Sequence, residues 1–479
     1  MTPAPRLTVA GLRGGAGKTL LSLGLARALA QDGVRLKPFK KGPDYIDAAW
    51  LALAADCPAT NLDLFFLPPQ ELRALFLYAC AQPGKDGNPP DFALIEGNRG
   101  LFDGRDLEGT YSTAALARTL QSPILLSLDC TKMTRTAAAL VQGVLNFEPD
   151  LPIGGVVLNK IASERHGALV RRVIEHYCPV PVLGALPRLL GDLLPERHMG
   201  LALRQGTETQ RADVETRLDA LAAAMREHLD LHRIRRLAQA ATPLAGEHMH
   251  WKEASPLPAG MRPRIGYVRD AVLWFYYEEN LEALRRAGAE LIRLSLLDDD
   301  AWPKLDGLYL GGGFPEDFPT ELAASPKLAL LKEYAQEGMP IYAECGGLLL
   351  LAASLECQGK SYPMAGVFPL RAGFHERPQG LGYVEAVAVL PNPFHPRHTA
   401  LKGHEFHYTR CEFLPGAQAE HILQLGCGVG MGRGGDGLLY KSTFASYMHL
   451  FAPAVPHWAE RFVAAAAGFA ARDTSRSPY

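Results

Sequence analysis

Residues 11–19, GLRGGAGKT, have the residue types of a loop that binds phosphate groups. In such a loop, glycine N–H groups close on phosphate oxygens, and the N-terminus of the next helix adds partial positive charge. Lys18 is expected to reach the β- and γ-phosphates of a nucleotide, and the Thr19 hydroxyl to hold Mg²⁺. The residues of this expected nucleotide site are Gly14, Gly15, Ala16, Gly17, Lys18 and Thr19.

The loop departs from the strict G-x-x-x-x-G-K-T pattern, because Leu12 stands where the first glycine should be. The variant R-G-G-A-G-K-T, with Arg13 ahead of paired glycines, fits better. The alternative is a glycine-rich turn that precedes Lys-Thr by coincidence. An apolar run at 7–12 predicts a strand before the loop, and the run 20–31 predicts a helix after it. This order favours the phosphate-binding loop.

Two aspartates follow a predicted strand and a Gly-Pro break. Asp44 and Asp47 are three residues apart, so they share a face of the helix expected there. Beside Lys40 and Lys41, they could hold Mg²⁺ and orient a substrate. The alternative is a pair of helix-start acids favoured by the helix dipole, next to two solvated lysines.

A third acid, Glu96, ends the buried-strand pattern of residues 91–96. In proteins with a phosphate-binding loop, a carboxylate at the end of a neighbouring strand assists the metal. Asp103 follows in a glycine-rich stretch, where aspartate is also a common turn residue.

In the second half of the chain, Cys345 lies between a predicted strand and a predicted helix in PIYAECGGLLLLAASL, 340–355. A nucleophile on a sharp strand-to-helix turn between small residues is exposed by the turn, and a helix N-terminus favours the thiolate. Gly311, Gly312 and Gly313 could supply N–H donors of an oxyanion hole, with Gly312 and Gly313 as the preferred pair. The alternative for Cys345 is a buried core cysteine.

A cysteine nucleophile needs a basic partner. His449, in FASYMHLF, is the preferred candidate because it follows a strand-like run. His404 and His407, in GHEFHYT, are its rivals. For an arbitrary histidine, a packing or surface role is the default.

The elements that must position these residues alternate between strand and helix. In the first half, predicted strands end in Glu96, Asp129 and Asn159, which is typical of a doubly wound parallel sheet with ligands at its carboxyl edge. Residues 207–236 have a helical composition. Residues 238–263 lose periodicity and gather Pro, Gly and Ala, which indicates a linker.

The strand–helix pattern then restarts at residue 264. The fold class expected is α/β with two doubly wound domains. We predict an N-terminal domain at 1–237, a linker at 238–263, a C-terminal domain at 264–470 and a flexible tail at 471–479.

Composition excludes several classes of protein. The 479 residues are 48% hydrophobic and 21% charged, as in ordinary globular proteins with two or three domains. A net charge of −2 gives no reason to expect nucleic acid or an anionic membrane as partner. No apolar run reaches the roughly 18 residues of a membrane span, and the N-terminus lacks the order of a secretory signal. The eight cysteines form no C-x-x-C pair, so neither a zinc site nor a disulfide framework is expected. A location in the reducing cytoplasm is expected instead.

Several motifs together resemble one family, the cobyrinic acid a,c-diamide synthases. They occur in the family's order between residues 11 and 449, and FKKGPDYID with AECGG and GHEFHYT is the most specific combination. The motifs are GLRGGAGKT, FKKGPDYID, IEGNRGLFDG, VVLNKIASERH, LPERHMGL, GGGFPE, AECGGLLLL, LGYVEA, GHEFHYT and SYMH.

The resemblance implies an N-terminal ATP-dependent amidoligase domain with a P-loop and a C-terminal domain of the class I glutamine amidotransferase type. It also implies roles for individual residues. Cys345 would be the glutaminase nucleophile and His449 its base. A third acid is usual two residues after this histidine, but here that residue is Phe451, so a catalytic dyad is expected.

In the N-terminal domain, the resemblance implies that Asn159 lies where the adenine base is recognised. The remaining roles concern the metal and the substrate. Thr19, Asp44 and Glu96 would serve Mg²⁺ binding, and Asp47 and Asp103 substrate activation.

The chemistry implied is ATP-dependent amidation of the a and c acetates of a modified tetrapyrrole, with cobyrinic acid as the first choice. ATP would convert a carboxylate into an acyl phosphate, and glutamine hydrolysis through a γ-glutamyl thioester would supply ammonia. The partners implied are glutamine and a carboxylate-rich tetrapyrrole, and a homodimer is expected.

The sequence also departs from the family pattern. It has Asn98-Arg99 in place of small or apolar residues, Lys132 and Arg135 in place of small ones, and Val384 in place of arginine. Added cations suit a carboxylate-rich substrate, which could be a different macrocycle such as sirohydrochlorin or sirohaem. Neutral drift is the alternative. A regulatory P-loop ATPase with an inactive amidotransferase-like domain is the competing class of function.

Overall fold

The computed structural model describes residues 5–188, 208–249, 251, 257, 261–417 and 419–474. The described chain divides into two compact units, the first ending before residue 250 and the second beginning at Trp251. The motif LPERHMGL, part of the expected linker and the end of the expected tail lie outside the described residues. No helix of the described residues is long and apolar enough to span a membrane.

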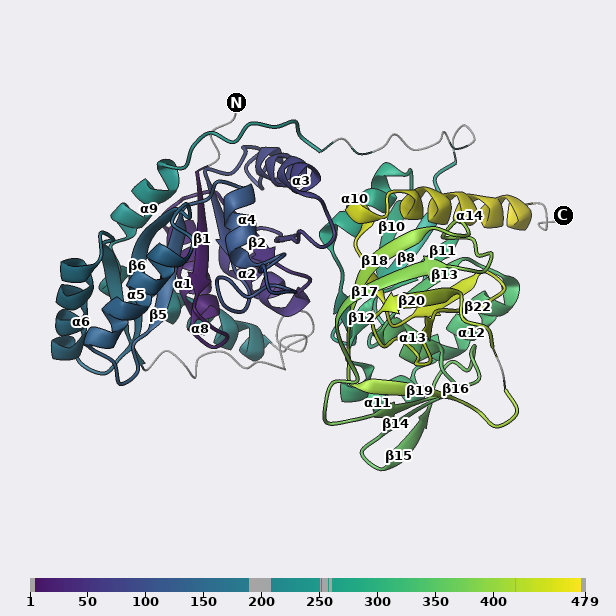
Figure 1. The fold of residues 1–479 in the computed structure, drawn as a ribbon. Helices are drawn as coiled ribbons and strands as arrows, with labels where there is room; N and C mark the ends of the chain where they lie inside the picture. Colours follow the sequence, from purple (N-terminus) through teal and green to yellow (C-terminus); the bar gives the residue numbers. More distant parts are fainter. Residues whose placement is uncertain are drawn as a thin grey trace. The chain divides into compact units, whose positions relative to one another are not determined.

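The first unit contains a seven-stranded sheet in the order β3-β2-β4-β1-β5-β6-β7 (Figure 1). Every neighbouring pair is parallel. β1, β4 and β5 are buried at every residue, as expected for strands covered on both faces. The strands are β1 Arg6–Gly11, β2 Leu36–Lys41, β3 Thr60–Leu62, β4 Phe92–Glu96, β5 Ile124–Asp129, β6 Ile153–Ile161 and β7 Val182–Pro187.

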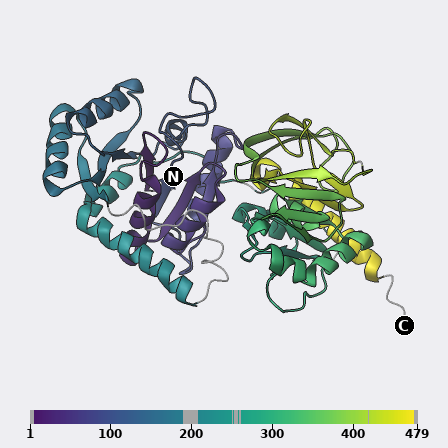
Figure 2. The ribbon, with the colours of Figure 1, turned by 90° about the horizontal axis from the view of Figure 1, so that it is seen from below.

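Helices cover both faces of this sheet. The chain moves from β1 toward β2 in one direction and from β5 toward β7 in the other, so right-handed crossovers place the connecting helices on opposite faces. Figure 2 shows the teal helix α8 on one side of the sheet and the blue helices α5 and α6 on the other. The helices are α1 Lys18–Gln31, α2 Tyr45–Ala55, α3 Pro69–Ala81, α4 Thr113–Thr119, α5 Arg135–Phe147, α6 Glu164–Tyr177, α8 Glu208–His228 and α9 Leu231–Gln239.

The helical stretch expected at 207–236 is two helices. α8 ends at His228, and Asp230 caps α9 by accepting a hydrogen bond from Arg233 N (2.9 Å). The cap redirects the chain between the two helices. α8 packs against α1, the helix that leaves the phosphate-binding loop.

The second unit is built on a six-stranded sheet in the order β10-β8-β11-β13-β23-β22, which is parallel except for the edge strand β22. The helix α14 packs on β8 and β11. Its Trp458 and Phe462 share a buried aromatic core with Tyr309 and Tyr342 of the sheet. The strands are β8 Arg264–Val268, β10 Glu290–Leu294, β11 Gly307–Leu310, β13 Ile341–Glu344, β22 Leu438–Tyr440 and β23 Thr443–Ser446.

The helices of this unit are α10 Glu278–Arg286, α11 Pro319–Ala324, α12 Lys327–Glu337, α13 Gly346–Leu351 and α14 His457–Thr474. The helix that follows Cys345 is therefore only six residues long, shorter than the apolar run LLLLAASL suggests. Ala352 has an extended conformation and ends it, and the chain continues into a strand.

Three smaller sheets complete the second unit, and sequence patterning did not separate them from the main sheet. They have the orders β12-β9, β15-β14-β16-β19 and β21-β20-β17-β18-β24. Their strands are β9 Leu273–Phe275, β12 Gly312–Gly313, β14 Ser354–Cys357, β15 Lys360–Pro363, β16 Leu370–Phe374, β17 Gly380–Ala388, β18 Ala400–His407, β19 Thr409–Phe413, β20 Leu423–Cys427, β21 Gly435–Asp436 and β24 His449–Leu450. The predicted α/β class with two units is confirmed.

Candidate active sites

The loop between β1 and α1 has the backbone of a phosphate-binding turn. Gly15 and Gly17 have positive φ angles of 69° and 83°, which favour glycine. A Cβ atom on Gly17 would also overlap with the side-chain amide of Asn159. Gly14 and Gly15 are exposed with open space beside them, while Ala16 is buried beneath the loop. Position 17 thus requires glycine for two reasons, its positive φ angle and the lack of room for a Cβ atom beside Asn159.

Asn159 lies under this loop at the end of the neighbouring strand β6. Its Nδ2 donates to Ala16 O (3.0 Å), and its Oδ1 accepts from Lys160 N (2.8 Å). Lys160 Nζ reaches over to Gly15 O (3.0 Å) and to Asp129 Oδ2 (3.0 Å). The end of β6 therefore holds the phosphate-binding loop in shape.

A network of ionisable groups forms at the carboxyl edge of the sheet. Glu96 Oε1 accepts hydrogen bonds from Thr19 Oγ1 (2.8 Å) and Lys40 Nζ (2.8 Å), and Lys40 Nζ also lies 2.5 Å from Asp47 Oδ2. Burial raises the pKa of Glu96 to about 7. Burial by itself lowers the pKa of Lys40, but the charges of Glu96 and Asp47 raise it overall. Four residues singled out by the sequence are thus in direct contact.

The fit of this network to Mg²⁺ can be tested on Glu96 Oε2, which is buried and has no hydrogen-bond partner among the described residues. A buried carboxylate oxygen without a partner is costly unless a ligand satisfies it. In the described part of the chain, no three His, Cys, Asp or Glu side chains gather to form a metal site on their own. Mg²⁺ is commonly held by one or two carboxylates with phosphate oxygens and water, so Thr19 and Glu96 fit it.

The other two aspartates have structural contacts of their own. Asp44 caps α2, with its Oδ1 accepting from Asp47 N (2.9 Å), and burial followed by the charge of Asp47 raises its pKa. Asp103 is exposed and accepts from Gly100 N (2.9 Å) in a turn. That turn lies against the phosphate-binding loop, since Leu101 N donates to Gly11 O (2.7 Å).

The loop cations are engaged as well. Lys18 Nζ donates to Arg13 O (3.0 Å), and burial followed by the charge of Lys40 lowers its pKa. Arg13 lies 2.8 Å from Asp129 Oδ2 in the same chain. Burial alone would raise the pKa of Asp129, but hydrogen bonds, first from Thr131 and then from Lys160 and Arg13, lower it. Asp129 is therefore an anion that contacts the loop directly through Arg13 and indirectly through Lys160, which binds Gly15 O.

Cys345 occupies the turn between β13 and α13 with a φ of 46°, an unfavourable conformation for a side chain of its type. Its Sγ lies 3.5 Å from Phe406 O. A Cβ atom on Gly346 would lie 2.9 Å from Gly313 N, so the glycine strand β12 closes directly on the turn. The strained turn and the adjacent glycine N–H groups match the arrangement expected of a nucleophile and its oxyanion site.

The thiol is not activated by the helix alone. Burial, with the charge of Glu316 next in size, raises the pKa of Cys345 well above its ordinary value. The Gly346 N–H at the start of α13 favours the thiolate, as expected, but desolvation outweighs it. Removal of the thiol proton requires a basic partner.

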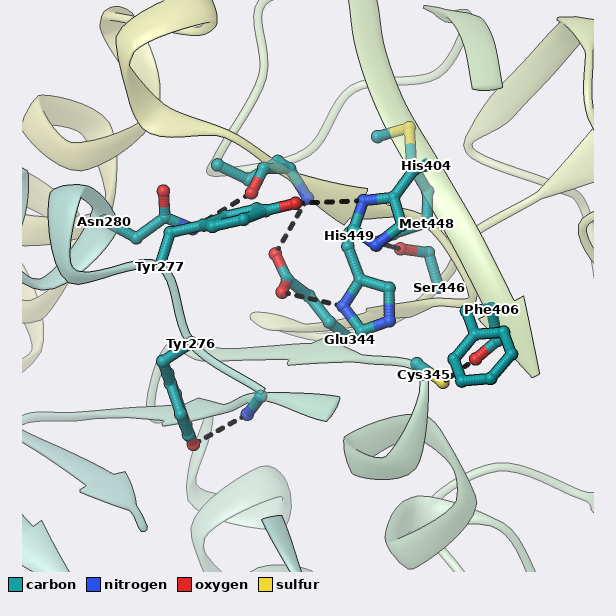
Figure 3. Close-up of polar contacts among 12 residues, drawn as sticks. Tyr276, Tyr277, Asn280, Glu344, Cys345, His404, Phe406, Ser446, Met448 and His449 are labelled. Carbon is teal, nitrogen blue, oxygen red and sulfur yellow. Dashed lines mark hydrogen bonds and ion pairs between the residues drawn. The ribbon is translucent and has the colours of Figure 1, made fainter. Parts of the chain in front are cut away.

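Of the three candidate histidines, His449 and His404 lie together in Figure 3. Their rings stack with centroids 4.8 Å apart, and a Cβ atom on Gly312 would collide with the His449 ring. His449 Nδ1 lies 3.4 Å from Glu344 Oε2. His404 Nδ1 lies 3.3 Å from Tyr277 OH, and burial followed by the charge of His449 lowers its pKa.

His407 has a different environment. Side chains alternate along β18, so His407 points to the opposite face from His404. Its Nε2 lies 3.5 Å from Glu405 Oε2, and its ring stacks on Tyr447 with centroids 3.7 Å apart. These contacts hold the His407 ring in the core, so a packing role explains its position.

Comparison with known proteins gives the same division of the chain. Residues 7–201 match the family described as CobQ/CobB/MinD/ParA nucleotide binding domain. Residues 264–455 match the family described as CobB/CobQ-like glutamine amidotransferase domain.

Full-length relatives match over nearly the whole chain. The cobyrinate a,c-diamide synthase of Magnetococcus marinus is 42% identical over 95% of this chain and 96% of its own length. Those of Archaeoglobus fulgidus and Salmonella typhimurium are each 36% identical over 96% of this chain and 97% of their own lengths. The chain belongs to the cobyrinate a,c-diamide synthase family.

Membership in the cobyrinate a,c-diamide synthase family makes the chain a glutamine-dependent amidoligase with a nucleotide-binding unit. It supports the main interpretation of the sequence over the regulatory ATPase. Two residues of the site were not predicted. In the sequence, Lys160 could have been found only as the basic residue directly after Asn159. Glu344 could have been found as the acid directly before Cys345.

Proposed function

We propose that this protein amidates the a and c acetate carboxylates of cobyrinic acid, with ATP as the phosphoryl donor and glutamine as the nitrogen donor. One observation supports it most directly: a single chain contains both sites that the reaction needs. The first is a phosphate-binding loop joined to a Lys-Asp-Glu network, and the second is a strained cysteine turn beside a histidine. The names of the relatives point to the same substrate.

In the first unit, the N–H groups of residues 14–19 would bind the phosphates of ATP, and Asn159 would lie beside the adenine. Thr19 and Glu96 would hold Mg²⁺, with Asp44 nearby, and the ion would supply charge neutralisation during phosphoryl transfer. Lys18 would leave Arg13 O and bind the β- and γ-phosphates. Lys40 keeps Asp47 and Glu96 in place.

The substrate carboxylate would be activated as an acyl phosphate, a far better electrophile than a carboxylate. Asp47 and Asp103 flank the loop and would orient the substrate for this step. Asp47 is fixed by Lys40, and the turn that contains Asp103 contacts the loop through Leu101.

In the second unit, His449 would take the thiol proton, and Cys345 Sγ would attack the side-chain amide of glutamine. The N–H groups of Gly312 and Gly313 would stabilise the oxyanion. Ammonia leaves with the proton held by His449, and a γ-glutamyl thioester remains for hydrolysis by water. The ammonia would then attack the acyl phosphate bound by the first unit, forming the C–N bond of the amide as the C–O bond to phosphate breaks, with release of inorganic phosphate and a proton.

The residues that depart from the family pattern have different surroundings. Val384 is buried in the core of the second unit, and the Arg135 guanidinium lies over the Tyr177 ring at 5.1 Å. Arg99, Lys132 and Arg135 are all exposed, so all three cations are candidates for contact with substrate carboxylates. Sirohydrochlorin or sirohaem, which carry the same acetates, is the second candidate substrate.

The test is an amidation assay with cobyrinic acid, hydrogenobyrinic acid, sirohydrochlorin and sirohaem in parallel, each with ATP and glutamine and read by mass. A gain of two amides on cobyrinic acid with the highest kcat/KM supports the proposal. A preference for a sirohydrochlorin-type macrocycle would overturn the substrate assignment. Light scattering would test the expected homodimer, and cell fractionation the expected cytoplasmic location.

A further inference from the structure

Glu344 is a buried acid placed directly against the presumed catalytic base. It is the last residue of β13 and immediately precedes Cys345. Its side chain and that of His449 are both fully buried, and Glu344 Oε2 lies 3.4 Å from His449 Nδ1. In the described part of the chain, His449 is the only basic side chain within ion-pair distance of Glu344.

Both carboxylate oxygens of Glu344 are held by donors. Oε1 accepts from Leu450 N (3.2 Å), the residue after His449 on β24, and Oε2 accepts from Tyr309 OH (3.2 Å). Because each oxygen has its own donor, the carboxylate cannot rotate without breaking one of these two contacts. Its orientation is therefore fixed relative to the strand that carries His449.

A second residue, Asn280, ties this network together. Its Nδ2 donates to Tyr309 OH (3.1 Å) and to Leu450 O (3.0 Å), and its Oδ1 accepts from Ala452 N (2.7 Å). Figure 3 shows Glu344 on one side of the His449 ring and Cys345 on another. The network thus positions both Glu344 and the backbone around His449.

The position at which a third acid was sought contains no acid. Phe451 lies two residues after His449, and its ring packs edge-on against Tyr277 with centroids 5.0 Å apart. The carboxylate reaches the histidine from a different strand, β13, because β13 and β24 meet through the Leu450 N–Glu344 contact. Sequence distance from the histidine could not reveal this neighbour.

We propose that Glu344 is the positioning acid of the glutaminase site, so that the protein works with a Cys345–His449–Glu344 set and not with a dyad. Nδ1–H of His449 faces Glu344, which assigns Nε2 as the atom that accepts the proton of Cys345 Sγ. The resulting imidazolium is stabilised by the neighbouring carboxylate of Glu344. The imidazolium then gives the proton to the departing ammonia as the C–N bond breaks and the thioester forms.

The inference rests on the proposed roles of Cys345 and His449. The experiment therefore distinguishes a failure of the role proposed for Glu344 from a failure of the proposed function. Glutaminase kcat and KM are measured for wild type, C345A, Glu344→Gln and the matched control Glu405→Gln. Glu405 is also buried, also lies beside a histidine and accepts from two backbone N–H groups, but it lies beside His407. Residual glutaminase activity in C345A would refute the proposed function itself.

The expected result for Glu344→Gln is a fall in kcat of at least ~100-fold with KM for glutamine within about threefold of wild type, by analogy with other residues that orient a catalytic histidine. Glu405→Gln is expected to keep kcat within about threefold. Ammonia-dependent amidation is expected to be unchanged in both variants. Equal losses in the two glutamine variants, or a kcat within threefold of wild type in Glu344→Gln, would overturn the inference.

A second measurement covers the case in which Glu344→Gln folds poorly. Glu344→Asp keeps the charge but shortens the side chain, and it is expected to retain more activity than Glu344→Gln. The rate of Cys345 alkylation by iodoacetamide, followed by peptide mass, is expected to fall in Glu344→Gln and to recover in part in Glu344→Asp. An unchanged alkylation rate in both variants would contradict a role for Glu344 in activating the thiol.

Discussion

Lys40 Nζ lies 2.8 Å from Glu96 Oε1, and both side chains are buried at the carboxyl edge of the first unit's sheet. The two residues are register partners on adjacent parallel strands, β2 and β4. The register therefore brings a cation and an anion together where water is largely excluded. Removal of Lys40 would leave the buried Glu96 carboxylate without its cation, whereas Lys40 also has Asp47 as a partner.

The first prediction follows from this pair. Lys40→Met is expected to destabilise the packing of β2 on β4 by about 3 kcal/mol above pH 7, where Glu96 is ionised. The double variant Lys40→Met/Glu96→Gln is expected to recover most of the loss, because both charges of the buried pair are removed together. Hydrogen–deuterium exchange of peptides from β2 and β4 measures the opening free energy. The control is Lys37→Met on the same strand, whose Nζ donates to Pro58 O and lies over the Phe39 ring, away from any carboxylate of the network. A loss as large in Lys37→Met would show that the buried pair is not the cause.

The second prediction concerns the phosphate-binding loop. Gly17→Ala adds a methyl group where the Asn159 amide lies, at a positive φ, so the loop must move. ATP affinity measured by calorimetry is expected to fall at least ~100-fold, while the glutaminase activity of the second unit stays within about twofold. The matched control is Gly143→Ala in α5, where a Cβ meets nothing within 4 Å. Wild-type ATP affinity in Gly17→Ala would show that the loop does not hold the nucleotide.

The sequence identified most of the residues that the fold brings together, because strand ends are predictable from apolar runs. Thr19, Asp47 and Glu96 come from three separate segments and meet at one sheet edge, as the carboxyl ends of parallel strands do. Asn159 was also expected at this edge. Its contact with Ala16 O depends on the conformation of the loop, which no spacing rule supplies.

The second unit was harder to predict, and Glu344 shows why. A strand of four residues places its last side chain opposite a histidine more than 100 residues away, through a pairing that only the folded chain defines. For Cys345, the sequence indicates a helix N-terminus that favours the thiolate, but it does not give the depth of burial that outweighs this effect. In both cases the missing information lies in packing between segments that are far apart in the sequence.

The third prediction separates the two half-reactions. Cys345→Ala is expected to abolish glutamine-dependent amidation while leaving amidation with added ammonium chloride at the wild-type rate, because ammonia bypasses the thioester. Product mass and glutamate release are measured in the same reactions. Cys427→Ser, a half-buried cysteine of the same unit, is the control and is expected to keep both activities. Loss of the ammonia-dependent reaction in Cys345→Ala would contradict this division of labour.

The last prediction concerns acid stability and His395. Burial, followed by the charges of His457 and Arg461, lowers the pKa of His395 to about 3. Because the unfolded chain binds a proton near pH 6.5 and the folded chain does not, the stability from this residue is complete above pH 6.5 and is lost as the pH falls toward 3. Between pH 7 and pH 5 the wild type is expected to lose about 2 kcal/mol through His395.

His395→Gln cannot take up a proton, so this part of the acid sensitivity is expected to disappear in the variant. The measurement is the pH dependence of thermal unfolding of the second unit, with His398→Asn as the control. His398 is exposed, only three residues away, and has a positive φ of 66° that asparagine tolerates. The same loss between pH 7 and pH 5 in His395→Gln as in wild type would show that other groups govern acid unfolding.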